Sequence, residues 1–159
     1  MNPEKKAEVS YSIRPMEKSD YDRVRKLWMS IHGFGIRSLD DSREYVCRFI
    51  ERNPSTSIVA ETEDGEIIGA ILCGHDGRTA CFYHVCVREE YRRHGIGNEM
   101  VATAMRALHR EHVSKVSLFA FTDNREGNLF WQAEGWKKRE DVNVYDFLLD
   151  EKNITRFNS

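Results

Sequence analysis

The sequence lacks a long run of apolar residues, and it lacks an excess of one charge. Without a run of about 20 apolar residues no helix can cross a membrane, and the polar residues 1–8 have no apolar centre of the kind found in secretion signals. The formal net charge of -2 gives no electrostatic reason for general nucleic-acid binding. We therefore expect a cytoplasmic protein that binds neither membranes nor nucleic acid.

Cysteine pairs at metal-ligand spacing are also missing. The four cysteines are Cys47, Cys73, Cys81 and Cys86, and none of them forms a C-x-x-C pair. All four lie in apolar or strand-like stretches, where a free thiol packs as a small apolar group. This favours reduced, buried thiols over a disulfide framework, and no metal site is expected.

The length of 159 residues suits one domain with a core of its own. We expect a flexible tail at residues 1–10, a single domain at 11–150 and a C-terminal tail at 151–159. Alternation and apolar runs predict strands at residues 11–15, 56–62, 66–73, 79–87, 115–121 and 142–149. Helical spacing and end signals predict helices beginning near residues 19, 41, 95 and 125. The order predicts an α+β fold, a mixed sheet flanked by helices.

The most informative stretch follows the strand at 79–87. It is a short basic turn that contains Gly95 and Gly97 and leads into a helix with apolar residues at helical spacing. The first N–H groups of a helix have no partner within the helix, and they favour an anion. This turn therefore predicts a site for a phosphorylated ligand.

Two common phosphate-binding motifs do not fit this turn. A dinucleotide fingerprint needs a third glycine where Met100 stands, and a strand–helix–strand unit that the preceding hairpins do not form. A P-loop needs Lys-Ser or Lys-Thr at the helix start, where Asn98 and Glu99 stand.

Residues 87–97 resemble the acyl-coenzyme A signature of the GNAT superfamily of N-acetyltransferases, with Arg92, Gly95 and Gly97 at its defining positions. A second element of the family is matched in spacing by Asp123-Asn124, Gly127, Phe130-Trp131 and Gly135-Trp136. The resemblance covers residues 13–149. Residues 74–78 and 82–85 look like those of a branch of small bacterial acetyltransferases that mostly lack an assigned substrate.

The resemblance implies the GNAT fold, a mostly antiparallel sheet with a splayed parallel strand pair, and acetyl-CoA as cofactor. The pantetheine arm is expected between the splayed strands, against the backbone of Cys86 and Val87. The pyrophosphate is expected beside Arg92, on the backbone of Arg93, His94, Gly95, Ile96, Gly97 and Asn98. Further cofactor contacts are implied for Asn124, Gly127, Phe130 and Trp131. Alternatives remain: a solvated basic turn, a helix cap at Asn124, and core packing at Phe130 and Trp131.

The implied activity is N-acetylation of a primary amine by direct attack on the thioester, so Cys81 and Cys86 are not required as nucleophiles. Ribosomal-protein alanine acetyltransferases use a glutamate base and a tyrosine acid, and Phe119 and Trp131 stand at those positions here. Neither side chain can relay a proton. Their mechanism therefore does not transfer intact.

The remaining catalytic candidates are Tyr83, His84 and Tyr145. Neighbouring strand residues point to opposite faces, so we expect at most one of Tyr83 and His84 to face the acetyl group. Histidine changes protonation near neutral pH and suits a base, although a packed or hydrogen-bonded core histidine also fits the pattern. Tyr145 suits an acid or ordinary strand packing.

The loop at residues 32–40 is expected to border the acceptor pocket, with Trp28, Phe34 and Arg37 as wall residues or as ordinary packing and surface residues. The alternative function is a non-catalytic acyl-CoA-binding sensor, favoured by the two replaced catalytic side chains. The sequence does not name the amine acceptor, and it permits a homodimer without specifying one.

Overall fold

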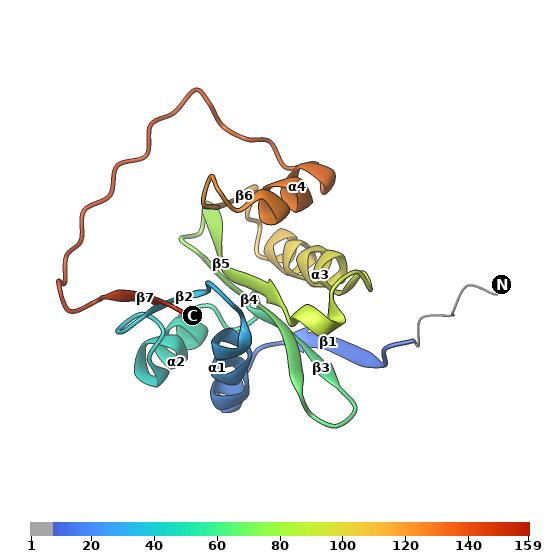
Figure 1. The fold of residues 1–159 in the computed structure, drawn as a ribbon. Helices are drawn as coiled ribbons and strands as arrows, with labels where there is room; N and C mark the ends of the chain where they lie inside the picture. Colours follow the sequence, from blue (N-terminus) through green and yellow to red (C-terminus); the bar gives the residue numbers. More distant parts are fainter. Residues whose placement is uncertain (1–7) are drawn as a thin grey trace.

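A five-stranded sheet forms the centre of the protein, whose computed structural model describes residues 8–159 (Figure 1). The strands lie in the order β1, β3, β4, β5 and β6, with bounds Tyr11–Pro15, Ile58–Thr62, Ile67–His75, Thr79–Val87 and Lys115–Leu118. Neighbouring strands run antiparallel except for β5 and β6. The expected mixed, mostly antiparallel sheet is confirmed. Most of the tail expected at residues 1–10 lies outside the described residues.

Helices cover both faces of this sheet. α1 (Tyr21–Ser30) and α2 (Arg43–Arg52) pack on one face, while α3 (Ile96–Arg110) and the shorter α4 (Arg125–Ala133) pack on the other (Figure 1). Short 3-10 helices at Lys18–Asp20 and Glu89–Tyr91 precede α1 and α3. Buried apolar side chains form one cluster on each face, so the sheet separates two cores.

Local sequence signals set the helix ends. The Ser42 hydroxyl caps α2 by accepting a hydrogen bond from the Tyr45 N–H at 3.3 Å. Shortly after α1, Gly33 takes a φ of 71°, a conformation that glycine adopts without strain.

The parallel pair β5 and β6 separates along its length, as expected. Their pairing begins with Thr79 opposite Lys115 and stops with Phe82 opposite Leu118. β5 itself continues to Val87, still paired with β4 on its other side. The later half of β5 therefore presents an edge to which no strand of the described residues is bonded.

A bulge interrupts β5 in this same half. Leu72 of β4 lies opposite Tyr83, but Ala70 lies opposite Cys86, so two residues of β5 face one residue of β4. One of these two is His84, whose φ of 51° is rare for a residue with a Cβ atom. The bulge shifts the alternation of side chains for the rest of the strand.

The end of the chain differs from expectation. β6 ends at Leu118 rather than at residue 121, and residues 142–149 do not form the expected strand. A separate two-stranded sheet joins β2 (Gly35–Arg37), within the loop at 32–40, to β7 (Thr155–Phe157), within the segment expected as a tail. Strands of three residues separated by more than a hundred positions leave no local pattern that sequence reasoning can detect.

Candidate functional site

His84 lies at the bulge, on the face of the sheet covered by α1 and α2. Its ring centroid is 5.0 Å from that of Trp28 and 4.8 Å from that of Phe34, two of the expected acceptor-pocket residues. Tyr83 packs edge-on against Phe49 of α2, with ring centroids 6.0 Å apart. Because Phe49 and Trp28 belong to the same cluster, Tyr83 and His84 lie on the same face. The premise that these neighbours point to opposite faces is wrong, and the bulge is the physical reason.

Asp41 is the buried partner of His84. Both carboxylate oxygens of Asp41 lie 2.8 Å from His84 Nε2, and the two side chains are only 13% and 3% exposed. The Arg37 N–H donates to the same carboxylate at 2.6 Å, and the Tyr21 hydroxyl donates to the Asp41 carbonyl at 2.6 Å. Asp41 is therefore held firmly in one orientation.

This contact fixes the tautomer of His84. An ionised carboxylate only accepts hydrogen bonds, so Nε2 must carry a proton. In the neutral ring, Nδ1 is then the nitrogen with a free lone pair, and it can accept a proton from a bound molecule. The arrangement is that of a base whose orientation is set by a third group.

Tyr83 is 40% exposed at the surface beside this pair. Burial of part of the ring, together with the neighbouring Cys81 thiol, raises the pKa of Tyr83 to about 12. The phenol is therefore protonated at neutral pH and can donate a proton but not accept one. The positive charge of Arg37, from the expected pocket wall, acts on Tyr83 in the opposite direction.

The third catalytic candidate lies elsewhere. Tyr145 is 88% exposed in the extended segment between α4 and β7. The structure therefore brings together Tyr83 and His84 but not Tyr145 within one chain. Phe119 is 72% exposed just beyond the end of β6.

The cysteines are free thiols in the structure. Cys73 and Cys86 are buried, whereas Cys47 and Cys81 are half-buried. Burial raises the pKa of Cys86 to about 12, so its thiol stays neutral and is a poor nucleophile. Among the described residues no cluster of His, Cys, Asp and Glu could hold a metal ion.

The basic turn leads from β5 into α3 with an unusual backbone. Arg93 and Gly95 take positive φ angles of 65° and 79°, and His94 between them does not. Such alternation turns successive N–H groups toward one concave side, where an anion can bind. The first i to i−4 bond of α3 runs from the Glu99 N–H to the Gly95 carbonyl, so the N–H groups of Ile96, Gly97 and Asn98 precede it.

The glycines of this turn lie in different surroundings. A Cβ atom on Gly95 would meet nothing within 4 Å, whereas one on Gly97 would lie 3.4 Å from Phe130 Cζ. Gly95 is exposed, so a ligand can approach its backbone directly. Arg92 has a structural contact of its own, since its Nε donates to the Val87 carbonyl at 3.0 Å.

Asn124 caps α4, which is one of its two expected roles. Its Oδ1 accepts from the Gly127 N–H at 3.0 Å, and a Cβ atom on Gly127 would lie 2.5 Å from Asn124 Nδ2. Phe130 and Trp131 are partly buried against the α3 cluster, with their ring centroids 4.9 Å apart. Their packing role is therefore present, and it leaves room for contact with a ligand on the exposed side.

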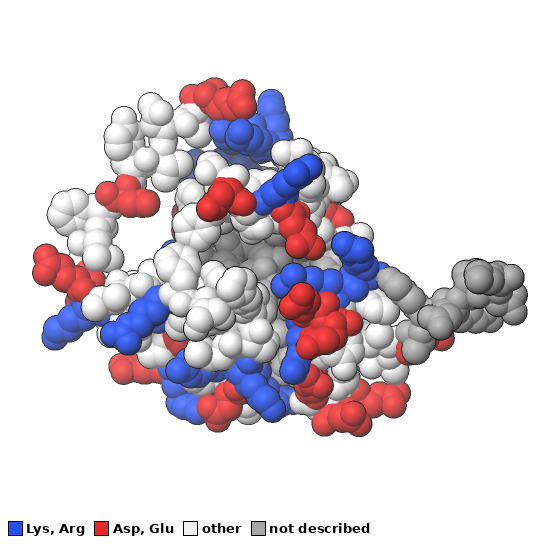
Figure 2. Space-filling model, in the orientation of Figure 1, with Lys and Arg blue, Asp and Glu red and all other residues white. Residues whose placement is uncertain are grey.

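Two other features belong to this part of the molecule. The surface drawn in Figure 2 is hollowed near its centre, where Figure 1 shows β5. The indole Nε1 of Trp28 is buried without a hydrogen-bond partner among the described residues. An unpaired buried donor is costly, and it lies within the aromatic packing around His84.

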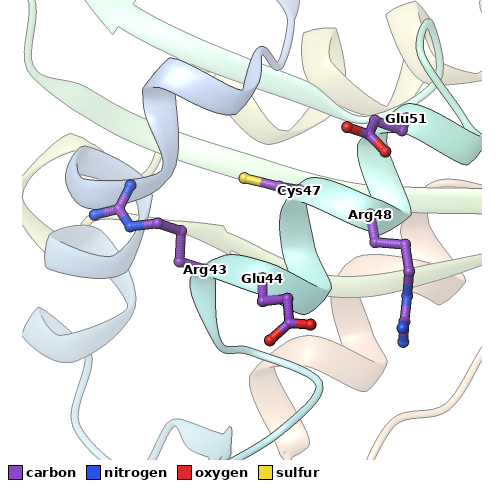
Figure 3. A pocket seen from close by; sticks show the side chains of 5 residues that line it. All are labelled: Arg43, Glu44, Cys47, Arg48 and Glu51. Atoms are coloured by element: carbon purple, nitrogen blue, oxygen red, sulfur yellow. The ribbon is translucent and has the colours of Figure 1, made fainter.

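A shallow depression on α2 is a poor alternative site. Its lining comes from one side of this single helix, as Figure 3 shows: Arg43, Glu44, Cys47, Arg48 and Glu51. These side chains include no buried polar group and no aromatic ring. No helix among the described residues is long and apolar enough to cross a membrane.

Sequence reasoning missed Asp41. The pattern places this residue only at the start of α2, where an acidic residue is common. The one signal available was that Asp41 follows directly on the loop expected to border the acceptor pocket.

Known proteins resemble this chain along most of its length. The model of the acetyltransferase (GNAT) family matches residues 21–136. An acetyltransferase of Sodalis glossinidius is 29% identical over 112 residues, which are 70% of this chain and 77% of that protein.

Two solved structures share the fold. The PaiA N-acetyltransferase of Thermoplasma acidophilum, in complex with coenzyme A, has a TM-score of 0.70 and 17% identity, and the match covers 94% of this chain and 99% of that one. Ard1 of Thermoplasma volcanium has a TM-score of 0.67 and 21% identity, with 80% and 82% covered.

Proposed function

This chain belongs to the GNAT family of acetyltransferases, and on that basis we propose that it transfers an acetyl group from acetyl-CoA to a primary amine of a small molecule, peptide or protein. Bound acetyl-CoA would supply the acetyl group already activated as a thioester. One observation carries the proposal. β5 bears at its bulge His84, whose buried partner is Asp41, and the end of β5 leads through the short 3-10 helix at Glu89–Tyr91 into the basic turn before α3.

The residues of the turn fit an anionic coenzyme. The alternating φ angles at Arg93 and Gly95 form a concave row of N–H groups, and the start of α3 adds a partial positive charge. Exposed Gly95 leaves that row accessible. These residues would hold the pyrophosphate, while the unpaired edge of β5 near Cys86 and Val87 would bind the pantetheine arm through its backbone.

Removal of a proton from the acceptor amine is the task of His84 in this proposal. A lysine-like ammonium group, with a pKa near 10.4, loses its proton at pH 7 at a cost of about 4.6 kcal/mol. His84 can accept that proton at Nδ1 because Asp41 binds the proton on Nε2. Trp28 and Phe34 both pack against the His84 ring.

Tyr83 is the hydrogen-bond donor of the proposal. With its pKa raised to about 12, the phenol carries its proton throughout the physiological range and can donate a hydrogen bond to a departing thiolate. Direct attack of the amine needs no covalent enzyme intermediate, which suits the neutral, buried thiol of Cys86.

Release of free thiol from acetyl-CoA across a library of amines and peptides tests the proposal. We expect turnover with some acceptors, and its loss in His84→Ala with little change in coenzyme A affinity by calorimetry. Coenzyme A binding without turnover on any acceptor would favour the alternative, a non-catalytic sensor. Absence of coenzyme A binding would contradict both.

The proposal includes a cytoplasmic location, which the four free cysteines support. It also includes a homodimer, for which the exposed segment before β7 gives a structural reason.

A further inference from the structure

Residues 137–154, which make up most of the segment between α4 and β7, are called the arm. It carries an unusual density of large apolar side chains in solvent, with Tyr145, Phe147 and Leu149 at 88%, 87% and 93% exposed. Four further side chains of the arm are more than half exposed: Val142, Val144, Leu148 and Ile154. An apolar surface of this kind marks a place where another molecule binds.

The middle of the arm, residues 142–149, is extended and its backbone is unpaired. Among the described residues, no backbone hydrogen bond involves residues 142–149. Yet the sequence there alternates and is rich in Val, Tyr, Phe and Leu, which favours a β-strand. A strand-forming sequence with unpaired N–H and C=O groups needs the edge of another strand.

Both ends of the arm are fixed, so it is not a loose tail. Before it, the Trp136 ring lies 4.8 Å from Trp131 and 5.5 Å from Phe82, between ring centroids. After it, β7 pairs with β2, and Asn158 Nδ2 donates to the Trp28 and Ile31 carbonyls at 2.8 and 2.9 Å. Residues 152–154 also bond to the loop at 38–40, with Ser38 Oγ donating to the Lys152 carbonyl at 2.6 Å, whereas the middle of the arm stands clear of the body (Figures 1 and 2).

The sheet offers a matching edge. β6 is the last strand in the order and is paired only with β5. Directly after β6 come Phe119 and Phe121, which are 72% and 69% exposed. Lys115 on β6 is opposite in charge to Asp146 of the arm.

We propose that residues 142–149 form a strand on the open edge of β6 in a second copy of this chain, and that the second copy returns its own arm, giving an intertwined dimer. Every copy carries one arm and one open edge, so the exchange closes with two-fold symmetry and leaves neither unpaired. This proposal does not depend on acetyl transfer.

The area available is sufficient for a stable dimer. Aromatic side chains bury about 150–250 Å² each, and the arm adds several aliphatic ones. Two such arms approach the roughly 1,600 Å² of a standard protein interface. Exchange also carries Tyr145 to a sheet of the partner.

Two measurements on the full chain test the exchange together. Sedimentation velocity at about 50 µM, well above the dissociation constant expected of a standard interface, should give twice the 18.6 kDa of one chain. Amide hydrogen exchange should show residues 142–149 protected in this dimer and unprotected after dilution to monomer. Residues 115–118 should exchange more slowly in the dimer than in the monomer, where only their pairing with β5 protects them. The double variant Phe147→Asp/Leu149→Asp should be monomeric and folded by circular dichroism. The control Met105→Asp, at a 39% exposed residue of α3, should remain dimeric.

Three results would overturn the proposal. A wild-type monomer at that concentration excludes exchange. A dimer whose residues 142–149 exchange freely uses another surface. Protection of these residues that persists in the monomer means that the arm pairs with β6 of its own chain. If the double variant does not fold, the measurements on the wild-type protein alone decide.

Discussion

His84 and Asp41 lie 43 positions apart in the sequence, yet the imidazole Nε2 is 2.8 Å from both oxygens of the buried carboxylate. The contact is made possible by the bulge in β5, which turns His84 toward the α1/α2 face. It leaves Nδ1 as the only ring nitrogen that can accept a proton from a substrate.

We expect Asp41→Asn to lower kcat by about a hundredfold, the lower end of what a positioned base contributes. The asparagine amide can donate a hydrogen bond to an unprotonated Nε2 as well as accept one from a protonated Nε2, so the variant side chain would no longer fix the tautomer of His84. The limb of the pH–rate profile that belongs to the base should shift, while coenzyme A affinity stays the same. The neighbouring exposed carboxylate gives the control, Asp40→Asn, which should change kcat by less than about twofold. An unaltered profile in Asp41→Asn would remove Asp41 from the mechanism.

Tyr83→Phe should lower kcat by about tenfold or more, because the hydrogen bond to the departing thiolate is lost. Partial burial raises the pKa of Tyr83 to about 12, so the phenol does not titrate below pH 10. The ratio of wild-type to variant rates should therefore be constant between about pH 6 and pH 10. A ratio that changes across this range would contradict the assignment of a permanently protonated donor. Tyr45→Phe on α2 is the matched control.

Gly95→Glu should weaken coenzyme A binding by at least about tenfold, since it places a carboxylate beside the row of N–H groups. The left-handed backbone adds a stability cost of about 1–2 kcal/mol. Gly77→Glu is a close control: Gly77 has a φ of 87°, and, as at Gly95, a Cβ atom would meet nothing within 4 Å. Calorimetry should show equal losses of stability but a loss of affinity in Gly95→Glu alone. Equal affinities would refute the phosphate site.

Asn124→Ala and Gly127→Ala should each destabilise the protein by about 1 kcal/mol, because both disturb the cap of α4. A Cβ atom on Gly127 would lie 2.5 Å from Asn124 Nδ2, so the second change costs less once the amide is gone. Denaturant unfolding of the double variant should therefore show less than the sum of the two effects. Strict additivity would mean that the two residues do not act together.

Acid should destabilise the fold through a cluster of ion pairs beside α1. Burial alone would raise the pKa of Asp20, but hydrogen bonds from Arg14 and from the Glu17 N–H, with the charge of Arg23, lower it below the ordinary 3.8. Hydrogen bonds from Arg23 and Arg14 likewise lower the pKa of Glu61. Depressed carboxyl pKa values give stability that is complete above the unfolded-state pKa and is lost as the pH falls through the folded-state one.

The free energy of unfolding should thus decline below about pH 4, and Arg14→Met should reduce this decline. Arg14 makes two hydrogen bonds of 2.8 Å to Asp20, so its loss leaves a buried carboxylate with fewer partners. Lys18→Met removes an ion pair with Glu51 that is exposed on both sides and should change little. If Arg14→Met and wild type lose stability in parallel on acidification, the cluster is not responsible.

Much of the fold followed from the sequence because its signals are local. Alternation in β5 and helical spacing after Gly97 depend on neighbouring residues, and Asn124 with Gly127 forms a cap within four positions. The splayed pair was implied by the family resemblance and is present. The cofactor contacts expected at the turn remain predictions.

The arrangement of the residues around the expected acceptor pocket was harder to predict from the sequence, for a physical reason. A bulge changes which face a side chain occupies without altering composition, so alternation gave the wrong relation between Tyr83 and His84. The partnership with Asp41 depends on how α1, β2 and the bulge meet in space. Residues 142–149 have a strand pattern whose partner is absent from their own chain's sheets, and pattern alone cannot reveal where a strand pairs.

The pairing of β2 with β7 bears on the order of folding. α3 packs mainly on β3, β4 and β5, which precede it in the chain, whereas Gly35 pairs with Phe157 near the other end of the chain. The loop before Asp41 therefore closes only when distant segments meet. Contacts between distant segments form late. Refolding followed by pulsed amide labelling should protect α3 before Gly35–Arg37, and the opposite order would contradict this. The part of the protein around α3, which suits the anionic coenzyme, is thus expected to fold first. The part around β2, which orients His84, is expected to fold afterwards.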